Sequence, residues 1–171
     1  MRLIVFIVSA FLSQLAATEP LKVGQIAPNW MLTGLDNEAV LLYDEAESGN
    51  TTVMVFWTSW CRSCQVLLPG IEKLKKRAGE RPIKFYALNI WDENSEEEQA
   101  QEASTAKKHV TSLKVLPKAE NVAERFNVKG TPGIIVVGPD KKIKYIRQQV
   151  GTKTKSAVID QLASILDINM Q

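Results

Sequence analysis

The apolar positions in the middle of the chain change from a continuous run to a helical spacing. Val53 to Trp57 is an uninterrupted β-branched and aromatic run, which predicts a buried strand. Beyond it, apolar residues recur at helical spacing (Val66, Leu67, Ile71, Leu74). This spacing predicts a helix that continues to about Ala78 and is kinked near Pro69. The order in this stretch is therefore strand, loop, helix.

Shorter patterns before and after this stretch predict further elements. Ahead of it we expect a hairpin with strands at Trp30–Thr33 and Ala39–Tyr43, and then a polar linker at Glu45–Asn50. After it, the pattern of Pro82–Ile90 predicts a strand parallel to the first one, joined by a right-handed crossover. Leu113–Leu116 is expected to be a short strand or an extended link.

The C-terminal third predicts a helix, a strand pair and a closing helix. Pro117 is expected to begin the helix, with Val122, Ala123 and Phe126 facing inward. Ile134–Val137 predicts a strand, 138–141 a turn, and the following apolar positions (Ile143, Tyr145, Val150) a paired return strand. The closing helix begins at about Thr154, and its predicted buried stripe is Val158, Leu162, Ile165 and Leu166.

Asp92 to Val110 is the most polar segment and predicts a helix on the surface. Ser95 and Glu98 fit a capping box, and basic residues occupy the last turn. This helix is interpreted as a solvated face, with the steering of a basic partner as the alternative. His109 is interpreted as a charge at the helix end rather than a catalytic group.

Residues 1–17 have the pattern of an export signal. A basic start, an apolar core from Leu3 to Leu12 and a small, polar exit are typical of secretory signals, and we place cleavage after Ala17. Retention of the segment as an N-terminal membrane anchor is the alternative. Residues 18–171 then form one domain, and the expected location is the bacterial periplasm or cell envelope. A net charge of +2 gives no reason to expect nucleic acid binding.

Cys61 and Cys64 are the only cysteines, and their Cys-x-x-Cys spacing suggests redox chemistry. Cys61 falls at or just before the first helical turn, where unpaired N–H groups and the helix dipole stabilise a thiolate. We therefore expect Cys61 to attack and Cys64, one turn inside the helix, to resolve. A structural disulfide, half of a metal site and an accidental spacing are the alternatives. A closed zinc site wants four ligands, and His109 is the only histidine, so no metal is expected.

Two motifs resemble the thioredoxin superfamily. Trp60 directly before Cys61, and Pro69 eight residues after it, are similar to the active-site segment of that superfamily. Thr131-Pro132 ahead of an apolar strand resembles its cis-proline segment. In addition, Gly24-x-x-Ala27-Pro28 matches the opening motif of the exported TlpA/ResA/CcmG group.

The resemblance implies an α/β thioredoxin-like fold: a central mixed sheet flanked by helices, with an N-terminal hairpin extension and a helical insertion. It implies that Pro132 is cis and packs against the cysteine pair, and that the main chain of Thr131 pairs with substrate polypeptide. Trp60, Arg62 and Ser63 are the expected supporting residues. Arg62 either favours the thiolate or is an exposed loop charge.

Two positions depart from the relatives. Many thioredoxins have a buried aspartate six residues before the first cysteine, where this chain has Val55. Proteins like ResA have a glutamate three residues after the second cysteine, where this chain has Leu67. The proton acceptor for Cys64 is therefore not identified, and an assignment to haem-ligation chemistry is weakened.

The predicted function is a periplasmic thiol:disulfide oxidoreductase that needs no cofactor and reduces protein disulfides. Apocytochrome c and a copper-site assembly protein are candidate substrates. A membrane thiol transporter of the DsbD/CcdA type is the expected electron donor, because an exported dithiol needs a supply of electrons. An oxidase or isomerase of the same fold and a Cu(I) metallochaperone are the alternatives.

Overall fold

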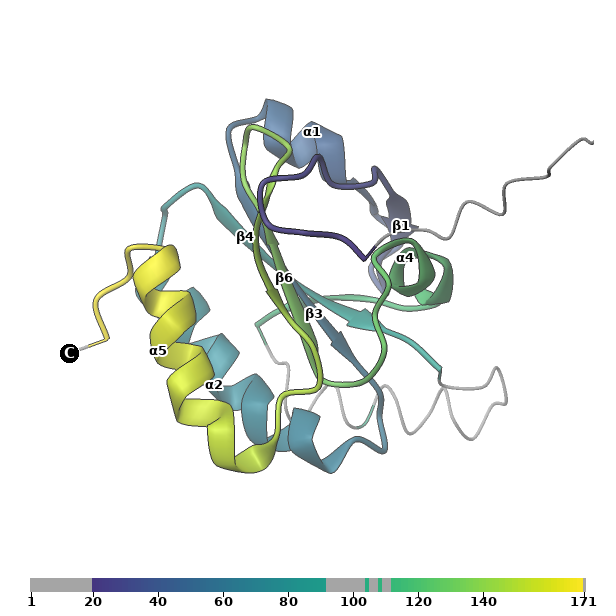
Figure 1. The fold of residues 1–171 in the computed structure, drawn as a ribbon. Coiled ribbons are helices and arrows are strands. Elements are labelled where there is room, and N and C mark those ends of the chain that lie inside the picture. The colour runs from purple at the N-terminus through teal and green to yellow at the C-terminus, as the bar shows by residue number, and fades with distance from the viewer. Residues whose placement is uncertain (1–19, 92–103, 105–107, 109–111, 171) are drawn as a thin grey trace, which may run out of the picture.

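The computed structural model describes residues 20–91, 104, 108 and 112–170, and it is built around one mixed sheet (Figure 1). The strands are β3 (Thr51–Trp57), β4 (Ile83–Asn89), β5 (Lys114–Leu116), β6 (Gly133–Val137) and β7 (Ile143–Arg147), in the order β5-β4-β3-β6-β7. β3, β4 and β5 are parallel, whereas β6 is antiparallel to β3 and β7 to β6. The thioredoxin-like sheet predicted from the sequence is confirmed.

Both faces of the sheet are covered (Figure 1). One face carries α2 (Arg62–Ala78) and α5 (Lys155–Ile165), which follows a short 3₁₀ turn at Thr152–Thr154. The other face carries α4 (Glu120–Arg125), α1 (Leu42–Glu47) and the hairpin of β1 (Met31–Thr33) and β2 (Ala39–Leu41). Val53, Val55 and Trp57 pack toward the first face, and Met54 and Phe56 toward the second. Val53–Trp57 of β3 is therefore apolar at every position because this part of the strand is buried on both sides.

The predicted second hairpin strand at Ala39–Tyr43 extended too far, and the predicted linker at Glu45–Asn50 is helical in its first half, because α1 occupies Leu42–Glu47. β2 ends at Leu41, and the backbone N–H of Leu42 bonds to the carbonyl of Trp30 at 3.0 Å. Leu42 and Ala46 lie one turn apart on α1, and both are buried. Two apolar positions in six residues are too weak a pattern to predict a helix from the sequence. A helix this short is stabilised by the tertiary packing of its apolar face.

Two predictions in the C-terminal third also need correction. Pro117 does not begin a helix: α4 begins at Glu120, because Lys118 adopts a φ of 56° and the N–H of Ala119 bonds to the carbonyl of Asn89. Ile165 is not part of the buried stripe of α5, since 42% of it is exposed. Val158, Leu162 and Leu166, the last at the C-cap of the helix, are buried as predicted, and Ile159 and Ala163 are buried beside them.

Some predictions lie outside the described residues. These are the segment 1–17 and most of the polar helix at 92–110, including His109; within the latter only Ser104 and Lys108 are described, both as helical. Across the described part of the chain, none of the helices combines the length and apolar character required to cross a membrane.

Several chain segments meet at one edge of the sheet. The parallel strands β3 and β4 end there together, with Trp57 paired to Asn89. β6 begins at the same edge because it is antiparallel to β3, and Gly133 pairs with Phe56. The loop that carries the cysteines therefore leaves the sheet between the end of β4 and the start of β6.

Candidate active site at the edge of the sheet

The loop between β3 and α2 places Cys61 at the start of the helix. A turn is closed by the N–H of Cys61, which donates to the carbonyl of Thr58 at 3.2 Å. The side chain of Gln65 reaches back to the carbonyl of Ser59 at 3.2 Å. Cys61 is the N-cap of α2, and its Sγ accepts the backbone N–H of Cys64 at 3.0 Å. An N–H group at the helix start thus points at a sulfur atom, and it is shared with the carbonyl of Cys61, also at 3.0 Å.

Cys61 and Cys64 form a disulfide with an S–S distance of 2.09 Å and a Cα–Cα distance of 5.2 Å. Cys61 is 6% exposed and Cys64 is fully buried, in the order expected for an attacking and a resolving sulfur. Both belong to the apolar cluster beneath α2, which also contains Trp57. Of the two cysteines, only Cys61 therefore retains any exposure to a partner.

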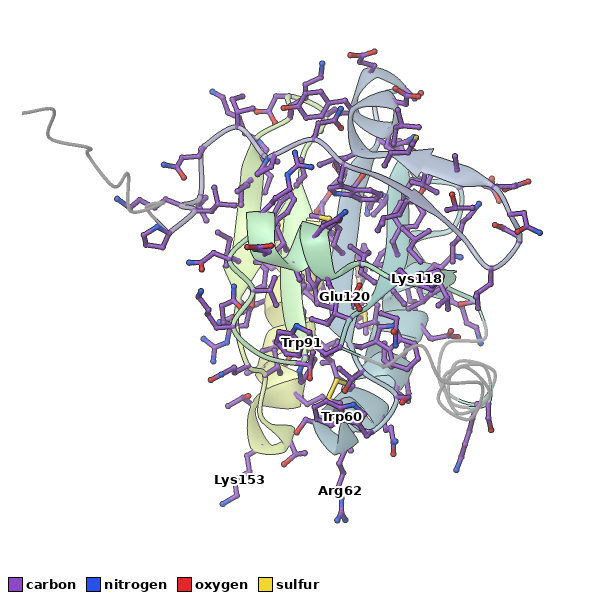
Figure 2. All side chains as sticks on the ribbon, turned by 90° about the vertical axis from the view of Figure 1, so that its right-hand side faces the viewer. Trp60, Arg62, Trp91, Lys118, Glu120 and Lys153 are labelled. Atoms are coloured by element: carbon purple, nitrogen blue, oxygen red, sulfur yellow. A yellow bond between two sulfur atoms is a disulfide. The ribbon has the colours of Figure 1, made fainter. Side chains whose placement is uncertain are left out.

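The predicted supporting residues surround the pair in different ways. Trp60 is 61% exposed and lies on the face that carries the disulfide (Figure 2). Arg62 is exposed, and its side chain points away from the sulfur atoms into solvent (Figure 2). Ser63 is half-buried in the first turn of α2. This geometry favours the interpretation of Arg62 as an exposed charge.

The segment before β6 lies on the other side of the cysteine loop. The Thr131–Pro132 peptide bond is cis, as predicted, and Pro132 is buried opposite the end of β3. The carbonyl of Pro132 accepts the N–H of Val150 at 2.9 Å. By contrast, the main-chain N–H and C=O of Thr131 have no backbone partner among the described residues.

Neither position at which relatives carry an acid near the cysteines holds a carboxylate in this chain. Val55 and Leu67, at the two positions where relatives carry acids, are buried in the same apolar cluster as the cysteines. Glu72 is the only buried carboxylate among the described residues, and it accepts the N–H of Ser112 at 2.7 Å. It lies about 12 Å further along α2 than Cys64, at 1.5 Å per residue. Within the same described part of the chain, no three acidic, His or Cys side chains form a metal site.

The sequence analysis did not single out Trp91, which lies at the same edge. It lies two residues beyond the end of β4 at Asn89, and 43% of it is exposed. Its backbone N–H donates to the Glu120 carboxylate at 3.0 Å. The sequence did contain a signal for this residue: Trp91 directly follows the strand predicted at Pro82–Ile90. Parallel strands end at the same edge of a sheet, so this end was expected near the end of the strand before Cys61.

The fold and the Cys-x-x-Cys disulfide at this edge define a thioredoxin-like protein. Solved structures with the same fold include a DsbE-like thiol:disulfide interchange protein from Chlorobium tepidum, with a TM-score of 0.72 and 20% identity over 85% of this chain and 99% of that one. StoA from Bacillus subtilis has a TM-score of 0.64 and 17% identity over 82% of this chain and 97% of its own. At these identities the likeness describes the fold alone.

Residues 23–146 match the AhpC/TSA family, and the chain belongs to that family. Similar proteins include the thioredoxin-like protein YneN of Bacillus subtilis, 27% identical over 81% of this chain and 78% of its own. The thiol-disulfide oxidoreductase ResA of Bacillus thuringiensis is 25% identical over 88% of this chain and 82% of its own. The predicted resemblance to ResA-type proteins is confirmed, and so is the class of thiol-disulfide oxidoreductase.

Proposed function

We propose that this protein reduces disulfides in exported proteins. The observation that carries the proposal is the position of the Cys61 sulfur, at the N-terminus of α2 and accepting the N–H of Cys64. After reduction of the pair, the same N–H and the helix dipole stabilise a thiolate on Cys61. The location in the periplasm or cell envelope is part of the proposal and rests on the signal-like pattern of residues 1–17.

The reaction proceeds in two exchanges. The Cys61 thiolate attacks one sulfur of the substrate disulfide, which forms a mixed disulfide and releases the other substrate sulfur as a thiolate. Cys64 loses its proton and attacks Cys61, which releases the second substrate thiol and leaves the Cys61–Cys64 disulfide. Two electrons pass from the protein to the substrate, and a dithiol donor of the DsbD/CcdA type restores the reduced pair. Because Val55 and Leu67 are apolar, the proton of Cys64 passes to water or to the departing substrate thiolate.

The reduction potential of the Cys61–Cys64 couple tests the direction of the reaction. Equilibration against thiol redox buffers is expected to give a value near that of thioredoxin, about −270 mV. A value near about −120 mV indicates an oxidant and overturns the proposal. Reduction of an oxidised apocytochrome c peptide, compared with an oxidised copper-site protein, then distinguishes the two candidate substrate classes.

A further inference from the structure

Trp91 leaves the sheet beside the cysteine loop. Asn89 pairs with Trp57, and the N–H of Ile90 donates to the carbonyl of Trp57 at 3.0 Å, so the ends of β3 and β4 remain adjacent up to this point. Figure 2 shows Trp60 and Trp91 on the face of the molecule that carries the disulfide. Two exposed indoles therefore accompany the sulfur atom that is open to a partner.

The backbone at Trp91 is in a conformation that a bulky residue rarely adopts. Its φ is 59°, in the left-handed region, which costs on the order of 1 kcal/mol for a residue other than glycine. Among the described residues with positive φ, Trp91 is the only aromatic one. The carboxylate of Glu120, in the first turn of α4, holds this conformation by accepting the Trp91 N–H. Because 43% of the residue is exposed, burial of the indole offsets only part of this strain.

We propose that Trp91 selects the substrate segment by packing against an apolar or aromatic side chain next to the substrate cysteine. This inference rests on the proposed function. β4 and β6 lie on opposite sides of β3, so Trp91 and Thr131 flank the cysteine loop. An extended substrate paired with the free main-chain groups of Thr131 crosses Cys61 and continues toward Trp91.

The distances between strands set which substrate residue meets Trp91. Neighbouring strands lie about 4.8 Å apart, and an extended chain advances about 3.3 Å per residue. The side chain one to three positions from the substrate cysteine therefore reaches the indole. Tryptophan supplies a large apolar surface with little conformational freedom to lose, and it is common among residues that dominate binding. An apolar or aromatic neighbour of the cysteine is the chemistry that this surface fits.

The test uses the full chain and two peptide disulfides that differ in one residue, Phe or Ser, two positions from the attacked cysteine. We expect the wild type to prefer the Phe peptide about tenfold in kcat/KM, which corresponds to about 1.4 kcal/mol. Trp91→Ala is expected to remove this preference. The readout is the ratio between the peptides, which a general loss of activity does not change. Trp91→Gly is the second variant, because glycine adopts the left-handed φ freely.

Ile165→Ala is the matched control. Ile165 is 42% exposed, almost as much as Trp91, and lines a cavity of about 530 Å³ with Thr51, at the opposite end of β3. This variant is expected to keep the preference for the Phe peptide. Glu120→Ala is expected to weaken the preference, whereas Glu120→Gln keeps it because an amide oxygen still accepts the Trp91 N–H.

The outcomes separate the inference from the proposed function. If the wild type reduces neither peptide, the proposed function fails. If it reduces both and the Trp91 variants keep the wild-type ratio, the inference about Trp91 fails and the proposed function stands. Equal losses on both peptides in the Trp91 and Glu120 variants mean a structural role only, and they also overturn the inference.

Discussion

The backbone N–H of Cys64 points at the Sγ of Cys61 at a distance of 3.0 Å. The relationship follows from the position of Cys61 as the N-cap of α2, where a side chain accepts an N–H of the first helical turn. The same N–H also donates to the carbonyl of Cys61 at 3.0 Å. The relationship also makes the two sulfur atoms unequal: Cys61 receives this hydrogen bond at the loop, and Cys64 is buried beneath the helix. The chemical roles of the two cysteines are predicted from this difference.

Replacement of each cysteine in turn tests the assigned order of attack. Cys64→Ser is expected to accumulate a mixed disulfide with a protein substrate, because Cys61 attacks and nothing resolves the product. Cys61→Ser is expected to form none, and both variants should abolish turnover. Non-reducing gel electrophoresis with an oxidised substrate measures the adduct. Accumulation in Cys61→Ser instead of Cys64→Ser would reverse the roles.

Arg62 is expected to contribute little to the reactivity of Cys61. Its side chain points away from the sulfur atoms into solvent, where salt at about 0.15 M screens its charge (Figure 2). Arg62→Gln should change the alkylation rate of the reduced protein by less than about fivefold, by analogy with exposed ion pairs worth less than about 1 kcal/mol. Stopped-flow alkylation at two salt concentrations measures this. A tenfold slower rate that depends on salt would assign the thiolate-stabilising role to Arg62 after all.

Tyr86 is expected to make the fold sensitive to alkaline pH. Burial, and then the hydrogen bond of its hydroxyl to Glu45 at 2.5 Å, raise the pKa of Tyr86 far above the usual value. The folded state therefore keeps this proton at a pH where the unfolded chain loses it. The stabilisation is complete below about pH 10 and falls above it, by at most about 1.4 kcal/mol per pH unit.

The Tyr86→Phe variant isolates this contribution. It should be less stable than the wild type at pH 8 by about 1 kcal/mol, because the Glu45 carboxylate loses one partner and keeps its bond from Asn50 at 2.7 Å. The difference should shrink between pH 10 and pH 11. Urea unfolding at each pH measures both quantities, and a difference that does not depend on pH would contradict the assignment.

A carboxylate at position 67 is expected to destabilise this chain. Leu67 is 1% exposed and packs in the cluster that contains both cysteines, so Leu67→Glu places an ionisable group in an apolar site. The cost should be about 3 kcal/mol or more at pH 7 and smaller at pH 5, because burial favours the protonated form. Leu67→Gln is the matched variant without a titrating group. Equal stability of Leu67→Glu and Leu67→Gln at both pH values would mean that the site is open to water.

The sequence by itself determined the central strand, the cysteine helix and the order of elements around them. The apolar run of β3 and the helical spacing after Cys64 are strong local patterns, because each element is long and packs against the sheet core. The two cysteines and Thr131-Pro132 were likewise identified as motifs. The short elements were not: α1 and the start of α4 depend on contacts to Trp30 and Asn89 from distant parts of the chain.

The composition of the site was decided by the tertiary structure. That Trp91 lies beside the cysteine loop follows from the pairing of Asn89 with Trp57, which joins residues distant in the sequence. The outward direction of Arg62 and the exposure of Ile165 depend on which side of each helix meets the sheet. Local patterns carry propensity and periodicity, whereas strand register and packing against a distant surface are properties of the whole chain.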